Sequence, residues 1–181
     1  MVGIKNNRRV QQTRTQLKDA LLTLLADHSL ANITVTAICQ TADVNRGTFY
    51  AHYDNPATLF AAIEEDLTCQ VTPLIDATSP TLSWLPQVLT VIQQQDSASA
   101  IILANLQHSK VLQTILQPMR AQTLKRYQDR FDTRDAAVLN YYFEFYYSGA
   151  ISVISQWLAN GAKESPQQIA VIIDNVSEFG Q

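Results

Sequence analysis

Apolar residues recur every three to four positions along most of this 181-residue chain, and strict alternation of apolar and polar residues is rare. That spacing places apolar side chains on one face of an α-helix, whereas a half-buried strand requires a period of two residues. The chain also has only five glycines, no two of them within ten residues, so it contains no glycine-rich phosphate loop. The sequence therefore predicts an all-α fold and disfavours the nucleotide-binding folds.

Capping signals mark where the N-terminal helices begin. A first helix is expected at about 8–28. A second follows Thr34, which has the side chain of an N-cap and is flanked by the apolar pair of a hydrophobic staple. Asn45 can cap a third helix a few residues further on, and Asn55 followed by Pro56 begins a fourth that runs to about residue 71. Two short helices separated by a tight turn are thus expected between two longer ones.

A break at 72–80, which holds two prolines and a serine, divides the chain. It predicts an N-terminal domain at 1–55 with a connecting helix at 56–71, and a C-terminal domain at 72–181. Apolar periodicity in the second domain predicts helices at about 85–95, 98–107, 111–131 with a kink at Pro118, 136–158, and a last one from Pro166 after a capping box that begins at Ser165.

Catalytic and metal-binding patterns are missing from the sequence. It has no ExxH or HExxH pair and no plausible Ser/His/Asp or Cys/His set, and Cys39 and Cys69 form no CxxC pair. We expect a non-enzymatic protein without metal or cofactor, in a reducing cytoplasm. The segment 136–158 is long enough to span a bilayer, but Asn140, Glu144 and four tyrosines favour a buried helix of a globular protein.

Residues 34–53 have the layout of a helix-turn-helix, the motif that places its second helix in the major groove of DNA. With Ile38, Val44 and Phe49 assigned to a small core, the outward side chains are a cation and hydrogen-bonding groups, together with a glycine that permits close backbone approach. Such groups contact base edges and phosphates. The outward residues are Thr36, Asn45, Arg46, Gly47, Thr48, Tyr50, His52 and Tyr53.

The same stretch resembles a known family. Residues 33–60, ITVTAICQTADVNRGTFYAHYDNPATLF, are similar to the N-terminal domain of the TetR family of bacterial transcriptional regulators. The family pattern is Thr-Val-x-x-Ile followed by Val-x-x-Gly-Thr-aromatic-Tyr-x-His-aromatic. The similarity extends over about 8–70 and is most diagnostic at 45–53.

The resemblance implies a role for each residue of the motif. Thr36, Tyr50 and Tyr53 would mainly hold phosphates. Residues 45–48 would lie over base edges, with Arg46 as the expected contact to guanine. The full expected DNA-binding set is Thr34, Thr36, Asn45, Arg46, Gly47, Thr48, Tyr50, His52 and Tyr53, with Arg8 and Arg9 of the first helix at the DNA backbone.

Two positions depart from the family pattern. Asp43 stands where a turn glycine is common, and an aspartate adopts the left-handed backbone at some cost. Pro56 stands where the family usually has a lysine at the start of the fourth helix. One phosphate contact is therefore expected to be lost. Its loss would lower the affinity for DNA or make that affinity less dependent on salt concentration.

The net charge of -3 by itself argues against a nucleic-acid partner. The charge is unevenly distributed, however: residues 1–60 hold six basic and four acidic residues, whereas residues 61–181 hold seven and twelve. Five of the six N-terminal cations precede residue 19. A mildly basic N-terminal region joined to an acidic C-terminal one permits DNA binding and predicts modest non-specific affinity.

The C-terminal half is more weakly similar, over 146–170, to a TetR-like subgroup that includes regulators and coregulators of dihydroxyacetone kinase operons. This implies a ligand pocket and a homodimer, and the all-round apolar helix at 136–158 also favours a partner subunit. The expected ligand-binding residues are Trp84, His108, Met119 and Tyr127. The alternative, that these four are ordinary core or surface residues, fits the sequence equally well. The expected dimer interface comprises Tyr142, Tyr146, Ile151, Ile154, Trp157, Ile169, Ile172 and Ile173.

These features together predict a cytoplasmic, homodimeric repressor that binds a palindromic operator in double-stranded DNA. Its two recognition helices would lie one DNA turn apart, about 34 to 36 Å or somewhat more, and a small-molecule effector would release it. The alternative is a coregulator that keeps the fold but acts by binding another transcription regulator. Pro56 and the acidic composition motivate that alternative.

Overall fold

The computed structural model describes residues 2–76, 79, 82–95, 101–103 and 109–178, with side chains described from residue 8 onward except at 119, 121–122 and 177–178. Every regular element in these ranges is helical and none is a strand, which confirms the all-α prediction. The elements are α1 (Val2–Leu25), η1 (Leu30–Asn32), α2 (Val35–Ala42), α3 (Arg46–Tyr50), α4 (Pro56–Val71), η2 (Thr72–Leu74), α5 (Leu85–Gln94), α7 (Lys110–Leu116), η4 (Gln117–Met119), α8 (Arg120–Phe131), α9 (Ala136–Ala159) and α10 (Pro166–Glu178).

The chain divides into two compact units, residues 1–66 and 67–181. The boundary between the units falls within α4. Each unit buries apolar side chains of its own, and each is described separately below.

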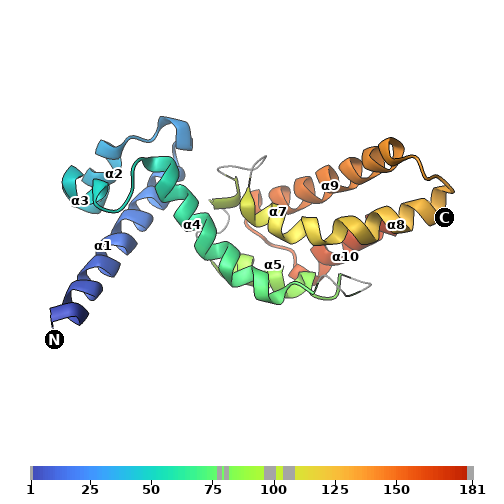
Figure 1. Ribbon diagram of the computed structural model, residues 1–181, viewed down its shortest axis with the longest axis horizontal. Helices are drawn as coiled ribbons and strands as arrows, with labels where there is room; N and C mark the ends of the chain where they lie inside the picture. The colour runs from blue at the N-terminus through green and yellow to red at the C-terminus, as the bar shows by residue number, and fades with distance from the viewer. Residues whose placement is uncertain (1, 77–78, 80–81, 96–100, 104–108, 179–181) are drawn as a thin grey trace. The chain divides into compact units, whose positions relative to one another are not determined.

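In the first unit α1 packs against α2, and α2 packs against α3 (Figure 1). Leu17 and Leu21 of α1, Ile38 of α2 and Phe49 of α3 are all completely buried. Burial of an apolar side chain of this size contributes roughly 1.5–3 kcal/mol. This small core holds α2 and α3 at a fixed angle and leaves their polar side chains outward.

Side-chain caps begin α2, α3 and α4 at the predicted residues, whereas α1 extends from Val2 to Leu25 instead of the expected 8–28. Thr34 Oγ1 accepts a hydrogen bond from the backbone N–H of Ala37 at 3.2 Å, at the start of α2. Asn55 and Thr58 cap α4 reciprocally: the Thr58 N–H donates to Asn55 Oδ1 at 2.9 Å, and the Asn55 N–H donates to Thr58 Oγ1 at 3.1 Å. Pro56 is the first residue of α4, where no backbone N–H is needed.

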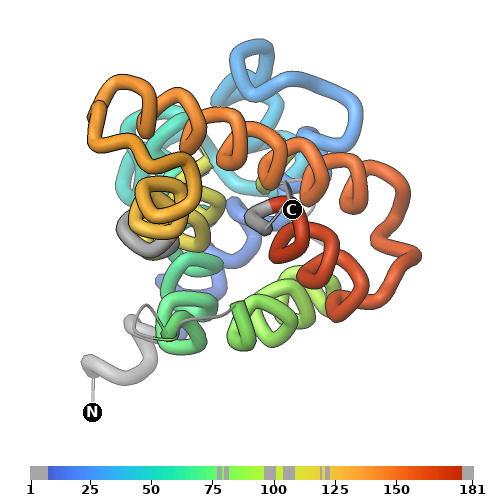
Figure 2. Tube along the Cα trace, turned by 90° about the vertical axis from the view of Figure 1, so that its right-hand side faces the viewer, coloured from blue at the N-terminus to red at the C-terminus, as the bar shows by residue number. Residues whose placement is uncertain are grey.

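In the second unit α8 packs against α9, and α10 packs against both α5 and α9 (Figures 1 and 2). The predicted kink at Pro118 is confirmed as a break, because α7 ends before a single 3₁₀ turn that contains the proline and α8 begins after it. The segment 101–103 is helical, and the remainder of the helix expected at 98–107 lies outside the described residues.

The connection between α9 and α10 follows the predicted signals. Gly161 has a left-handed backbone (φ 79°) just after α9 ends. The predicted capping box then begins α10: the Gln168 N–H donates to Ser165 Oγ at 3.2 Å, and the Ser165 N–H donates to Gln168 Oε1 at 2.9 Å. Local hydrogen bonds therefore fix where this helix begins.

The long helix α9 buries one face in the second unit and exposes another. Its outward residues at 141, 145, 148 and 152 are spaced three to four apart, so they form one stripe along the helix. Two of them are large aromatics, because Tyr141 is 76% exposed and Phe145 is 80% exposed. Across the described residues, no helix is both long and apolar enough to cross a membrane.

Candidate nucleic-acid interface

The helix-turn-helix consists of α2, the turn at 43–45 and α3. Asp43 adopts the left-handed backbone that the sequence analysis expects (φ 53°, ψ 46°), and its N–H donates to the Gln40 carbonyl at 3.4 Å. The Val44 N–H donates to the Cys39 carbonyl at 3.0 Å. These two bonds satisfy carbonyls at the end of α2 and turn the chain sharply toward α3.

Asn45 is the N-cap of α3, and this role occupies its side-chain oxygen. Asn45 Oδ1 accepts hydrogen bonds from the Thr48 backbone N–H at 2.7 Å and from the Thr48 hydroxyl at 3.1 Å. An amide oxygen has two lone pairs, so both are engaged. Bidentate recognition of adenine needs that oxygen as an acceptor. Asn45 can therefore offer DNA only the N–H donors of its Nδ2.

Gly47 lies beside this cap on the exposed side of α3. A Cβ placed on Gly47 would lie 3.2 Å from Asn45 Oδ1, closer than an ordinary van der Waals contact. A larger residue would press on the atom that caps α3. The glycine thus has a structural role in addition to the close approach to DNA that the sequence analysis expects.

Arg46 is the first residue of α3, and its side chain is exposed. Its guanidinium Nη2 donates a hydrogen bond to Thr36 Oγ1 of α2. The residue expected to contact guanine therefore contacts one that is expected to hold phosphate.

The two motif tyrosines occupy different environments. Tyr50 is 56% exposed and packs edge-on against Phe49, with ring centroids 5.6 Å apart. Tyr53 is only 7% exposed, and its ring lies 6.1 Å from that of Phe49. The expectation that Tyr53 faces outward is corrected: it follows the end of α3, where the chain turns back and packs this ring in the core. Tyr50 remains available to a phosphate.

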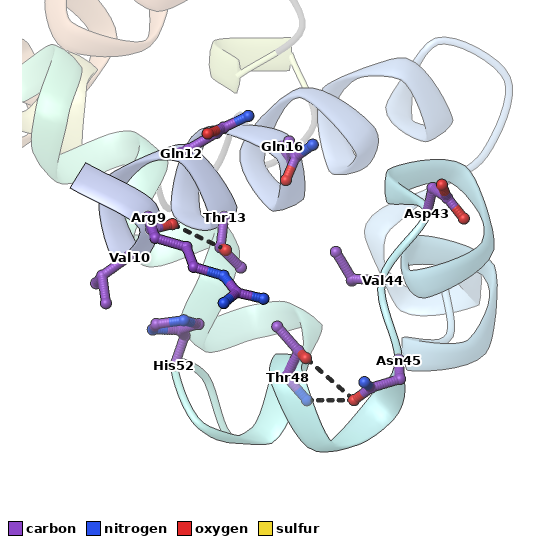
Figure 3. A pocket seen from close by; sticks show the side chains of 10 residues that line it. All are labelled: Arg9, Val10, Gln12, Thr13, Gln16, Asp43, Val44, Asn45, Thr48 and His52. Carbon is purple, nitrogen blue, oxygen red and sulfur yellow. Dashed lines mark hydrogen bonds between the residues drawn. The ribbon is translucent and has the colours of Figure 1, made fainter. Parts of the chain in front are cut away.

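A polar hollow of about 530 Å³ lies between α1 and the turn and helix α3 (Figure 3). The Arg9 side chain extends from α1 toward Thr48 and His52 (Figure 3). A guanidinium, a hydroxyl and an imidazole together can bind an anion such as a DNA phosphate. The polar hollow is lined by Arg9, Val10, Gln12, Thr13, Gln16, Asp43, Val44, Asn45, Thr48 and His52.

Gln12 and Gln16 also line this hollow. Neither is expected at the site from the sequence, because isolated polar residues on a helix carry no signal of their own. Arg8, the other arginine expected at the DNA backbone, is exposed on α1. Lys18 of the same basic run instead forms an ion pair with Asp66 of α4. Among the residues that the structure describes, no cluster of three or more His, Cys, Asp or Glu side chains is suited to a metal ion.

Two of the four residues expected at a ligand pocket can be located in the second unit. Trp84 is buried just before α5, and Tyr127 is buried on α8. His108 and the side chain of Met119 lie outside the described residues. The hollow that Tyr127 lines does not include Trp84.

Tyr127 lines a different feature, which the sequence analysis does not anticipate. The Phe131 and Tyr142 rings are stacked with centroids 4.2 Å apart and an angle of 13° between their planes. The Tyr127 ring lies 5.8 Å from each of them. This aromatic hollow has a volume of about 700 Å³ and is lined by Tyr127, Phe131, Val138, Tyr141, Tyr142, Phe145 and Val176.

The residues expected at a dimer interface divide by exposure. Tyr142, Ile151 and Ile172 remain at least partly exposed. The other five point into the second unit and are buried there, so they do not form its outer surface; they are Tyr146, Ile154, Trp157, Ile169 and Ile173. Periodicity identifies α9 and α10 as apolar, but their packing against α5 and α8 decides which side stays exposed.

Comparison with known proteins gives a family match for each part of the chain. Residues 17–63 match the family described as bacterial regulatory proteins, tetR family. Residues 81–178 match the family described as transcriptional regulator C-terminal region. A curated relative, the uncharacterized HTH-type transcriptional regulator YxbF of Bacillus subtilis, is 33% identical over 57 residues. The alignment covers 32% of this chain and only 15% of that longer protein.

Solved structures share the fold over nearly the whole chain. A TetR transcriptional regulator from Streptococcus agalactiae has a TM-score of 0.68 at 20% identity, covering 96% of this chain and 98% of the other. The dihydroxyacetone kinase operon activator DhaS has a TM-score of 0.51 at 18% identity, covering 92% and 94%. The matched families are transcriptional regulators and not enzymes. With its helix-turn-helix, its C-terminal match over more than half of its length and this shared fold, the chain belongs to the TetR family of bacterial transcriptional regulators.

Proposed function

We propose that this regulator is a homodimeric repressor that binds a palindromic operator and is released by a small-molecule effector. The observation that carries the DNA-binding part is the exposed guanidinium of Arg46 at the start of α3, which donates a hydrogen bond to Thr36 of α2. An arginine at that end of a recognition helix is suited to donate two hydrogen bonds to guanine O6 and N7. A protein with this role works in the cytoplasm, where bacterial operators are.

The polar hollow supports a phosphate contact beside the recognition helix. Arg9 brings a permanent positive charge to it, and Thr48 and His52 bring hydrogen-bonding groups. Contacts to phosphate fix the register of a protein on DNA without specifying sequence. We therefore assign Arg9 to the DNA backbone and Arg46 to a base pair.

The exposed stripe of α9 supports the homodimer. Tyr141 and Phe145 of α9 and Val171 and Ile172 of α10 are large apolar residues that remain exposed in the single chain. Exposed apolar patches of this kind mark interaction surfaces, and α9 packs beside α10 in the second unit. A two-fold axis through this face would bring the same residues of two copies together and pair their recognition helices on a palindrome.

The aromatic hollow supports the effector part of the proposal. Its volume of about 700 Å³ lies within the range of small-molecule sites. Its stacked rings suit a flat apolar molecule. Tyr141 and Phe145 border both the hollow and the exposed stripe, so a bound molecule there would affect dimer geometry directly.

The experiment is a mobility-shift assay with the full chain on the intergenic DNA upstream of its own gene, at two salt concentrations. Specific, salt-sensitive binding with reporter expression that rises when the gene is deleted supports a repressor. A fall in reporter expression would make the chain an activator. Failure to bind any sequence, together with co-purification of a second regulator, would favour the coregulator role that Pro56 motivates.

A further inference from the structure

We infer that Thr36 is a positioning residue for Arg46: its hydroxyl, carried by α2, holds the guanidinium in the orientation from which it contacts DNA. The inference rests on the proposed function, because it concerns how the base-contacting side chain is oriented. It differs from the role that family resemblance gives Thr36, which is direct contact with a phosphate. Under this inference, α2 contributes to base specificity indirectly, because its Thr36 orients the Arg46 side chain of α3.

The geometry joins two helices. Thr36 is the second residue of α2 and Arg46 is the first residue of α3, and the left-handed turn at Asp43 brings them together. Nη2 of the arginine donates to the threonine hydroxyl. Thr36 is half-buried whereas Arg46 is exposed, so the threonine is the fixed partner and the arginine is the one that gains order.

The electrostatics of Cys39 agree with a guanidinium that lies close to α2. Burial raises the pKa of the Cys39 thiol, and the positive charge of Arg46 opposes that rise. Cys39 follows Thr36 by three residues, so both lie on one side of the helix. The guanidinium is therefore near both residues, and its contact with Thr36 is part of a consistent orientation across α2.

The hydrogen bond with Thr36 leaves the arginine able to bind guanine. A guanidinium carries five N–H donors in a rigid plane, two of them on Nη2. One Nη2 hydrogen donates to Thr36. The other points in the same direction as an N–H of either Nη1 or Nε, and these two N–H groups form one edge of the guanidinium. One two-donor edge is thus available for the O6 and N7 acceptors of guanine.

Orientation before binding favours affinity because a long exposed side chain otherwise loses its rotamer freedom when DNA binds. Threonine is a suitable anchor, since its branched β-carbon restricts it to few rotamers. Valine has nearly the same shape but no hydroxyl. Replacing Thr36 by valine therefore removes the anchor with little change in volume.

The test uses the full chain and a duplex selected by the wild-type protein from a randomised library, together with single-base-pair variants of it. Arg46→Ala first identifies the base pair at which discrimination is lost. We expect Thr36→Val to reduce discrimination at that same base pair by about three- to tenfold, the effect of one hydrogen bond. Thr36→Ser, which keeps the hydroxyl, should retain most of it.

A double-mutant cycle separates positioning from direct phosphate contact. In the Arg46→Ala background, Thr36→Val should have no further effect, because there is no arginine left to orient. If Thr36→Val instead weakens all duplexes equally, or adds its full effect to that of Arg46→Ala, Thr36 contacts DNA itself and the inference is overturned. Thermal melting checks folding, and Thr36→Ala replaces Thr36→Val should valine disturb α2.

The same experiment distinguishes the two levels of the proposal. If no base pair responds to Arg46→Ala, or the wild type selects no sequence, the base contact in the proposed function fails and the positioning role fails with it. If Arg46→Ala acts at one base pair and Thr36→Val leaves that discrimination intact, only the positioning role fails.

Discussion

The two units of this chain expose opposite kinds of surface. Around α3 the first unit exposes polar side chains that already have hydrogen-bond partners, as Asn45 does with Thr48 and Arg46 does with Thr36. The second unit exposes the aromatic rings of Tyr141 and Phe145. An ordered polar surface can bind and release a polyanion, whereas an apolar one gains most when it is permanently covered. Under the proposed function, DNA specificity depends on a few polar groups of the first unit, and assembly depends on burial of the apolar surface of the second.

Placing a charge in the exposed aromatic stripe should have the largest effect. Phe145→Glu would put a carboxylate where the proposed dimer buries a ring, so we expect monomers in light-scattering chromatography. A monomer contacts one half-site only, and loss of the linked second contact should lower operator affinity by a factor of about 100 or more. The helical circular dichroism signal should change little, because Phe145 is 80% exposed in the single chain and is not needed for its fold.

A matched control is Gln113→Glu, which adds the same charge at an exposed residue of α7, outside the stripe. It should remain dimeric and bind DNA normally. A Phe145→Glu protein that stayed dimeric would place the interface elsewhere and remove the contrast between the two surfaces.

Removing Arg46, the residue proposed to contact a base pair, should have the next largest effect, confined to one position of the operator. Arg46→Ala should cost about 1–3 kcal/mol of specific binding free energy and abolish the preference for guanine at one base pair of each half-site. Competition between single-base-pair variants measures this directly. Equal weakening on every duplex would make Arg46 a phosphate contact, and the first unit would then lack its main specificity residue.

The sequence predicts the local features of both units well, because these depend on neighbouring residues. The caps at Thr34 and Ser165 and the break at Pro118 are confirmed, since a cap or a missing N–H acts within one helical turn. The position of Tyr53 is predicted wrongly because its direction depends on packing against Phe49 after the chain leaves α3. The Thr36 contact of Arg46 escapes prediction, since it requires the angle between two helices.

Packing between helices also decides which residues of the second unit are exposed. An all-round apolar pattern marks α9 as a helix with a partner on more than one side, but it contains no information on which side meets α8 and α10. Residues such as Ile154 and Ile173 are therefore expected at the dimer surface although they lie in the core. The aromatic hollow brings together residues of three helices, and no single stretch of sequence identifies it.

Separating the two roles of Asn45 sharpens the description of the polar surface. Asn45→Ala removes the acceptor that caps α3 and should lower the free energy of unfolding by about 1 kcal/mol. Asn45→Asp keeps the acceptor, so its stability should be close to that of the wild type, while its negative charge should weaken DNA binding. Chemical denaturation and mobility shift measure the two effects separately. Equal stability of the alanine and aspartate variants would show that the cap contributes little.

The contact assigned to Arg9 predicts a smaller change that is independent of sequence. Arg9→Gln should lower the slope of log affinity against log salt by about one and weaken specific and non-specific binding alike. Arg14→Gln is the matched control, because Arg14 is exposed on the same helix but does not line the polar hollow. Equal effects of the two variants would mean that only the net charge of α1 matters.

The smallest effect should come from a buried polar group in the second unit. Tyr146 is 2% exposed, and its hydroxyl has no hydrogen-bond partner among the described residues. Burial raises the pKa of this phenol, with nearby Tyr127 and Asp174 adding to the rise, so the group keeps its proton. A buried hydroxyl without a partner opposes folding. The second unit thus contains a buried hydroxyl without a hydrogen-bond partner in the described part of the chain, whereas Asn45 and Arg46 on the polar surface of the first unit have partners.

Tyr146→Phe removes that hydroxyl and leaves the ring. The free energy of unfolding should therefore stay the same or increase by up to about 1 kcal/mol, with Tyr50→Phe, at a 56% exposed residue outside the proposed dimer face, as the neutral control. Calorimetric melting of both variants measures the difference. A loss of more than about 1 kcal/mol in Tyr146→Phe would mean that the hydroxyl has a partner, such as an ordered water. The hydrogen-bonding capacity of this buried group would then be satisfied, as it is for the helix caps of the first unit.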